Sequence, residues 1–103
     1  MHALSVTVSR RPGTVVIRPC GEVDFDTAPA LVQALENADG AWRDVTVDLS
    51  RVGFMDSAGL HALITLHHRA LAHHGRLTLS AVCGQPARLF QLVRLEGMFG
   101  QDG

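Results

Sequence analysis

Hydrophobic residues follow two patterns along this chain. Alternation with a period of two is typical of a half-buried strand, whereas repeats every three or four positions are typical of an amphipathic helix. Alternating and β-branched runs predict strands at 4–8, 14–18, 44–49 and 77–81. Helical repeats begin near Asp26, near Ser57 and at Pro86. The predicted order of elements is therefore ββαβαβα.

A mixed β-sheet follows from this order. Arg10-Arg11-Pro12-Gly13 is a turn signal, so residues 4–18 are predicted to form an antiparallel hairpin. The later strands alternate with helices, and such crossovers join parallel strands with a right-handed connection. We therefore predict an α/β fold in which helices cover a mixed sheet.

The length of 103 residues predicts a single domain over residues 1–103. Its core is predicted at about residues 4–99. The last residues, 100–103, are expected to be frayed, as chain ends without a clear pattern often are.

The charge balance argues against binding to nucleic acids. Nine Lys+Arg against ten Asp+Glu give a net charge of −1, so there is no basic field to contact phosphates. No hydrophobic run approaches the roughly 18 residues of a membrane span, and the N-terminus lacks the pattern of a secretory signal. We therefore predict a cytoplasmic globular domain that binds neither nucleic acid nor a membrane.

The two cysteines, Cys20 and Cys83, have no metal-binding spacing. We predict that they are small buried hydrophobic residues in a reducing compartment. A disulfide between them is the less favoured alternative.

Five histidines fall on or just after the second predicted helix: His61, His67, His68, His73 and His74. A metal site on a helix typically uses two ligands four residues apart, and no pair here has that spacing. We expect most of them to be solvated residues near a helix C-terminus, where positive charge is mildly favourable. Neither a metal nor a cofactor is predicted, apart from weak adventitious binding at His73-His74.

The acidic segment 21–26 follows the second strand but lacks the spaced glycines and the lysine of a phosphate-binding loop. Asp26 or Thr27 is predicted to cap the next helix, and Pro29 suits its first turn. No local requirement for an acid is evident at Asp24.

Ser57 lies where a strand is predicted to meet a helix. A hydrolase nucleophile elbow needs glycine two residues before and two residues after the serine, but Met55 stands in the first of these positions. No triad partner can be assigned, so a small serine esterase is a remote alternative. Both Ser57 and Asp56 are suitable N-caps, and a helix N-terminus can also accept a phosphoryl group on the serine.

Three stretches resemble the STAS domain, specifically the bacterial anti-sigma factor antagonists. They are residues 21–31, 47–60 and 89–99, and the second, with Asp56-Ser57-Ala58-Gly59, is the most specific. The resemblance covers about residues 4–99 in the right order. Many relatives continue with a further short strand or helix, so a last edge strand after residue 96 is left open.

The resemblance implies a phosphorylation switch. An unphosphorylated antagonist of this family binds an anti-sigma factor that is also a serine kinase, and thereby frees a sigma factor. The kinase phosphorylates the motif serine, the complex dissociates, and a PP2C-type phosphatase restores the binding form. Ser57 matches that serine, Asp56, Ala58 and Gly59 match its frame, and Asp24 matches a nearby acid. These five residues are the predicted partner-binding site of a domain that is not an enzyme.

A second role in the same family is an unregulated STAS subunit of a transport or signalling assembly. That role does not require a serine at position 57. We expect Ala58 and Gly59 to let a partner approach the backbone closely, and Phe54 and Met55 chiefly to pack in the core.

Overall fold

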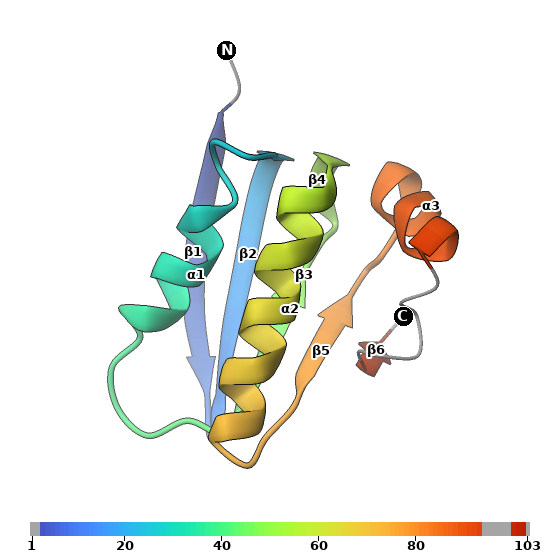
Figure 1. The fold of residues 1–103 in the computed structure, drawn as a ribbon. Coiled ribbons are helices and arrows are strands. Elements are labelled where there is room, and N and C mark those ends of the chain that lie inside the picture. The colour runs from blue at the N-terminus through green and yellow to red at the C-terminus, as the bar shows by residue number, and fades with distance from the viewer. Residues whose placement is uncertain (1–2, 94–99, 103) are drawn as a thin grey trace.

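The fold is a mixed β-sheet with α1 and α2 on one face (Figure 1). The computed structural model describes residues 3–93 and 100–102. In chain order the elements are β1 (Leu4–Arg11), β2 (Thr14–Val23), α1 (Pro29–Glu36), β3 (Asp44–Asp48), β4 (Arg51–Met55), α2 (Ser57–Ala72), β5 (Leu77–Ser80), α3 (Gly84–Val93) and β6 (Gly100–Asp102).

The strand order in the sheet is β1-β2-β3-β5-β6. β2 is long enough to have two neighbours on one side, because residues 14–17 pair with β3 and residues 20–23 pair with β4. β1 and β2 are antiparallel, whereas the other pairs are parallel. The predicted hairpin followed by parallel strands is confirmed.

The hydrophobic core lies between the sheet and the two helices. Alternate residues of the central strands are buried: Val15, Ile17, Val45, Val47, Leu77 and Leu79. Leucines from the helices belong to the same cluster: Leu31, Leu35, Leu63 and Leu66. Each such side chain contributes about 1.5–3 kcal/mol relative to exposure. This packing fixes α2, whose first residue is Ser57.

β4 is a strand that the sequence pattern did not predict. The carboxylate of Asp48 accepts a hydrogen bond from the N–H of Ser50 at 2.9 Å, which closes a turn after β3. Backbone and side-chain hydrogen bonds from Ser50 also lower the pKa of Asp48. The chain then continues as β4 beside the second half of β2. Only Val52 and Met55 are buried in β4, and they are three positions apart, so the strand lacks the alternation that would reveal it.

The predicted frayed end at 100–103 is wrong for residues 100–102. They form β6, which pairs in parallel with residues 78–80 of β5. Without β6, the edge of β5 would expose unpaired backbone groups, and a three-residue strand can pair with them without any hydrophobic pattern. A last edge strand therefore does follow residue 96, and the full order is ββαββαβαβ.

The prediction of buried cysteines is also wrong, since Cys20 and Cys83 are free and exposed. Cys20 lies two residues after the exposed Arg18 on β2, so both side chains point away from the helix-covered face. Cys83 lies in the connection before α3.

The C-terminal end of α2 is closed by backbone hydrogen bonds. The N–H of Gly75 donates to the carbonyl of Ala70, and the N–H of His74 donates to the carbonyl of Leu71. This is the Schellman pattern, which needs a left-handed residue and usually has glycine there. Here His74 takes that position with a φ of 63°.

Two contacts hold the connection between α1 and β3 against this helix end. The ring of His73 stacks on Trp42 with centroids 3.7 Å apart, and its Nδ1 lies 3.0 Å from the Trp42 carbonyl oxygen. A Cβ on Gly75 would lie 1.8 Å from the carbonyl oxygen of Arg43, so only glycine fits. At the C-terminal end of α2, His73 and Gly75 therefore pack against the connection that precedes β3.

Candidate functional site

Asp56 fixes the start of α2. Its backbone is extended, with φ −111° and ψ −169°, and its carboxylate accepts hydrogen bonds from the N–H groups of Ala58 at 2.9 Å and Gly59 at 3.2 Å. Its own N–H donates to the carbonyl of Val23 in β2 at 3.2 Å. Of the two predicted N-caps, Asp56 takes the role and Ser57 does not.

Ser57 is the first residue of α2, and its side chain is exposed. Its hydroxyl makes no hydrogen bond to another of the described residues. Because Asp56 already caps the helix, this hydroxyl is not used to stabilise the fold. The first N–H groups of a helix also carry a partial positive charge that favours an added anion.

Packing within the domain requires glycine at position 59. Gly59 is buried, and a Cβ at this position would lie 2.6 Å from Cγ of Met55 and 3.1 Å from the carbonyl oxygen of Val23. The glycine lets the first turn of α2 pack directly on β2 and β4, so a close approach by a partner is not needed to explain it. Met55 is fully buried, as expected, whereas Phe54 is partly exposed.

Asp24 also has a local role, contrary to the expectation from sequence. It is 8% exposed, and its carboxylate accepts hydrogen bonds from the N–H groups of Asp26 at 3.0 Å and Thr27 at 3.1 Å. The Thr27 hydroxyl accepts from the N–H of Asp24 and donates to the carbonyl of Glu22. Asp24 therefore closes the turn before α1, and neither Asp26 nor Thr27 caps that helix through its side chain.

The sheet brings the two acidic turns together. Val23 at the end of β2 is paired with Met55 at the end of β4, so Asp24 and Asp56 follow neighbouring strands at the same edge. The predicted proximity of Asp24 to the serine motif thus has a structural basis in strand pairing.

Gln85 in α3 supports the site from a distance in sequence. Its side-chain amide accepts from the N–H of Met55 at 2.7 Å and donates to the carbonyl of Met55 at 2.8 Å. The amide pairs with β4 as a neighbouring strand would, and it fixes the backbone just before Asp56. A glutamine at the start of a helix carries no local signal for such a role.

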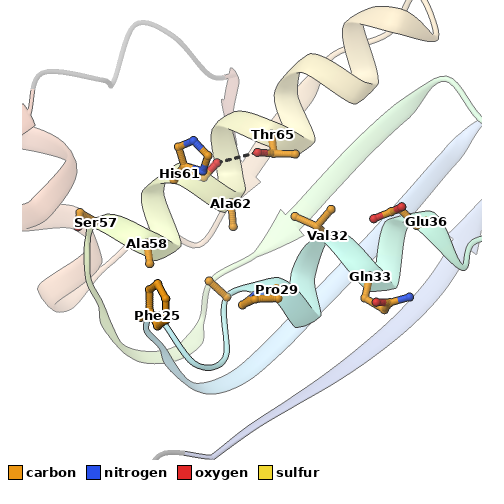
Figure 2. A pocket seen from close by; sticks show the side chains of 11 residues that line it. Phe25, Pro29, Val32, Gln33, Glu36, Ser57, Ala58, His61, Ala62 and Thr65 are labelled. Atoms are coloured by element: carbon orange, nitrogen blue, oxygen red, sulfur yellow. Dashed lines mark hydrogen bonds between the residues drawn. The ribbon is translucent and has the colours of Figure 1, made fainter.

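A groove of about 790 Å³ between α1 and α2 begins at Ser57 (Figure 2). Its lining includes Phe25, Pro29 and Val32 on one side and Ala58 on the other. Phe25 is 80% exposed. The sequence analysis did not include Phe25 in the site, although a phenylalanine between two aspartates could have indicated an exposed hydrophobic side chain.

The histidines are placed largely as predicted, because His61, His68, His73 and His74 are exposed. His67 is half-buried, and burial together with the nearby His68 lowers its pKa. Within residues 3–93 and 100–102, no cluster of three histidine, cysteine or acidic side chains could hold a metal ion. In the same part of the chain, no helix is both long and hydrophobic enough to cross a membrane.

Residues 6–100 match the family model described as "Mlab, STAS domain". The chain belongs to the STAS domain family. Its structure is also similar to an anti-sigma factor antagonist from Mycobacterium paratuberculosis, with 30% sequence identity and a TM-score of 0.82 over 96% of this chain and 85% of that one. The resemblance recognised in the sequence is confirmed.

Two more distant structures share the STAS fold. The unphosphorylated form of SpoIIAA, a Bacillus anti-sigma factor antagonist, is 24% identical with a TM-score of 0.81, covering 96% of this chain and 89% of that one. A sulfate transporter family protein from Wolinella succinogenes is 20% identical with a TM-score of 0.75, covering 89% and 75%. The same STAS fold therefore occurs in proteins with different roles.

Proposed function

We propose that this STAS protein is a cytoplasmic anti-sigma factor antagonist. Its unphosphorylated form binds an anti-sigma factor with serine kinase activity and frees a sigma factor. Phosphorylation of Ser57 releases the partner, and a PP2C-type phosphatase restores the binding form. The proposal is supported by the family and by the 30% identity to an antagonist over 96% of this chain.

The observation that carries the proposal is the unused hydroxyl of Ser57. It is exposed at the start of α2 while Asp56 performs the capping, so a kinase can modify it without removing a structural hydrogen bond. The helix N-terminus would partly stabilise the phosphate. The fold is therefore expected to persist in both states.

Release follows from charge on a binding face. A phosphoryl group adds about −1.5 to −2 charges, which a partner surface fitted to a neutral serine must repel or desolvate. The neighbouring acids Asp24 and Asp56 do not neutralise this added negative charge. Each ~1.4 kcal/mol of lost interaction lowers affinity tenfold, so one phosphate can end the complex.

The test is phosphorylation by the expected kind of kinase. The protein is incubated with ATP and, separately, with each ATP-binding anti-sigma factor encoded in its own genome, and peptides are mapped by mass spectrometry. We expect one phosphate at Ser57, no phosphate on Ser57→Ala, and normal modification of Ser50→Ala, which removes another exposed serine. Absence of phosphate at Ser57 with every such kinase would contradict the proposal.

The second candidate is an unregulated subunit of a transport or signalling assembly. The shared fold with a sulfate transporter family protein favours it at the level of fold alone. Neighbouring transporter genes would support it, whereas a neighbouring kinase, phosphatase or sigma factor gene supports the switch. An unregulated subunit should also bind its partner equally well with Ser57→Ala and Ser57→Asp.

A serine esterase is not favoured. Met55 is part of the core where an elbow needs glycine, and none of the described histidines forms a hydrogen bond with Ser57. We expect no labelling by a fluorophosphonate probe, and labelling of Ser57 would revive this alternative.

A further inference from the structure

The groove between α1 and α2 has the shape of a helix-binding surface. Ala28 and Ala62 line it and are buried, and Val32 is half-buried. Both helices begin at the Ser57 end (Figures 1 and 2). The eight residues of α1 extend about 12 Å at 1.5 Å per residue, which corresponds to about two turns of a third helix.

Phe25 is presented to solvent from a rigid turn at that end. Its ring is 80% exposed, while its neighbours Asp24 and Thr27 are joined by the hydrogen bonds described above. An isolated domain gains little from holding a phenyl ring in water. Aromatic residues are enriched at protein interfaces, and a pre-organised anchor loses little entropy on binding.

Glu36 is the only acidic side chain in the described groove lining, and it lies at the end opposite Ser57 (Figure 2). It is exposed and forms no ion pair with another described residue. The described lining contains no arginine or lysine, and its one histidine, His61, lies one turn after Ser57 on α2. The Glu36 carboxylate would attract a cationic side chain of a protein partner.

We propose that this groove binds an amphipathic helix of the anti-sigma partner. That helix places hydrophobic side chains at helical spacing around Phe25, Pro29 and Val32, and it places an arginine or lysine at Glu36. The inference rests on the proposed function and adds the kind of segment that the partner supplies. A small molecule fits less well, because such ligands are usually enclosed on most sides and this groove is open to solvent.

The position of Ser57 makes the groove compatible with the switch. Ser57 and Phe25 share one end, so a phosphate would stand beside the hydrophobic anchor and hinder its burial. Thr65, at the other end, follows Ser57 by eight residues, about 12 Å along α2. The partner's cation at Glu36 is therefore too far from the phosphate to compensate for it.

The test measures binding of the anti-sigma kinase that phosphorylates Ser57, with a non-hydrolysable ATP analogue present so that the serine stays unmodified. We expect Phe25→Ala to weaken binding about 30-fold and Glu36→Lys about tenfold. Leu92→Ala removes another highly exposed hydrophobic residue, and Asp39→Lys makes the same charge change outside the groove. Both controls should stay within about twofold of the wild type.

The outcomes separate the two proposals. Equal affinity of the groove variants and their controls, with Ser57 still phosphorylated, would overturn the groove and leave the proposed function standing. Failure of every anti-sigma factor to bind the wild-type protein would overturn both. Because all four substituted residues are exposed, loss of folding is not expected, and circular dichroism checks this.

A photo-crosslinking residue at position 25 or 33 tests the helix directly. Crosslinks should map to one helix of the partner, three, four or seven residues apart, with an arginine or lysine in the same helix. Crosslinks that fall on a strand or loop of the partner would overturn this part of the inference.

Discussion

Both ends of α2 are fixed by hydrogen bonds that cap the helix and by a tightly packed glycine, but the N-terminal end also presents a side chain that the fold does not use. At the N-terminal end Asp56 caps the helix and Gly59 packs on β2 and β4, which leaves the Ser57 hydroxyl without a structural role. At the C-terminal end His73 stacks on Trp42, and Gly75 packs on the backbone of the preceding connection. The function proposed for Ser57 rests on this contrast, because the fold does not need its side chain.

The largest effect is expected from Gly75→Ala at the C-terminal end. The new Cβ would lie 1.8 Å from the carbonyl oxygen of Arg43, so the backbone must shift, and we expect a loss of about 3 kcal/mol in the free energy of unfolding. Urea denaturation followed by fluorescence of Trp42, the one tryptophan in the chain, measures it. Gly53→Ala is the matched control, because no atom lies within 4 Å of its added Cβ. Equal stability of the two variants would refute the packing argument.

Gly59→Ala should be the next most harmful change. Its Cβ would meet the side chain of Met55 at 2.6 Å and the carbonyl oxygen of Val23 at 3.1 Å. Because the methionine can partly adjust, we expect a smaller loss of about 2 kcal/mol. If this variant keeps wild-type stability and loses only partner affinity, Gly59 contacts the partner rather than the sheet.

His74→Gly should act in the opposite direction. His74 occupies the left-handed position of the Schellman motif at a φ of 63°, and glycine adopts this conformation without steric cost. We expect a gain of about 0.5–1 kcal/mol in the same denaturation experiment. A loss of stability would mean that the imidazole makes a contact worth more than the backbone strain.

The smallest effect is expected from Ser57→Ala. The hydroxyl has no hydrogen-bond partner among the described residues, so the free energy of unfolding should change by less than about 0.5 kcal/mol. Asp56→Ala is the informative comparison, because losing an N-cap costs about 1 kcal/mol. A large loss from Ser57→Ala would show that the serine serves the fold after all.

The central part of the fold could be predicted because its hydrophobic pattern is regular. Alternation in β3 and β5 directly reflects which residues face α1 and α2, and the β-branched run in β2 coincides with residues 15–17, which are all buried. β4 and β6 escaped prediction because each depends on a neighbouring strand rather than on its own sequence. The exposed cysteines show the same limit, since residue type alone does not determine which face of a strand is covered.

The candidate site was predictable only where it depends on a short local segment of the sequence. The Asp56-Ser57 junction is a local feature of one short segment, and its cap could be anticipated. The hydrogen bonds of Gln85 to Met55 join residues 30 positions apart, and the groove joins two helices. Such features arise only when the chain is folded. Asp24 was predicted as part of the site, but its structural role was missed because sequence reasoning had assigned the capping of α1 to Asp26 or Thr27.

The most direct test of the central claim compares partner affinity of Ser57→Asp with that of Ser57→Ala. Both variants should be as stable as the wild type to within about 0.5 kcal/mol, so a difference in binding isolates the charge. We expect Ser57→Ala to bind the anti-sigma factor as tightly as the unphosphorylated protein and Ser57→Asp to bind at least about tenfold more weakly. Equal affinity of the two variants would contradict the claim that charge at Ser57 controls the complex.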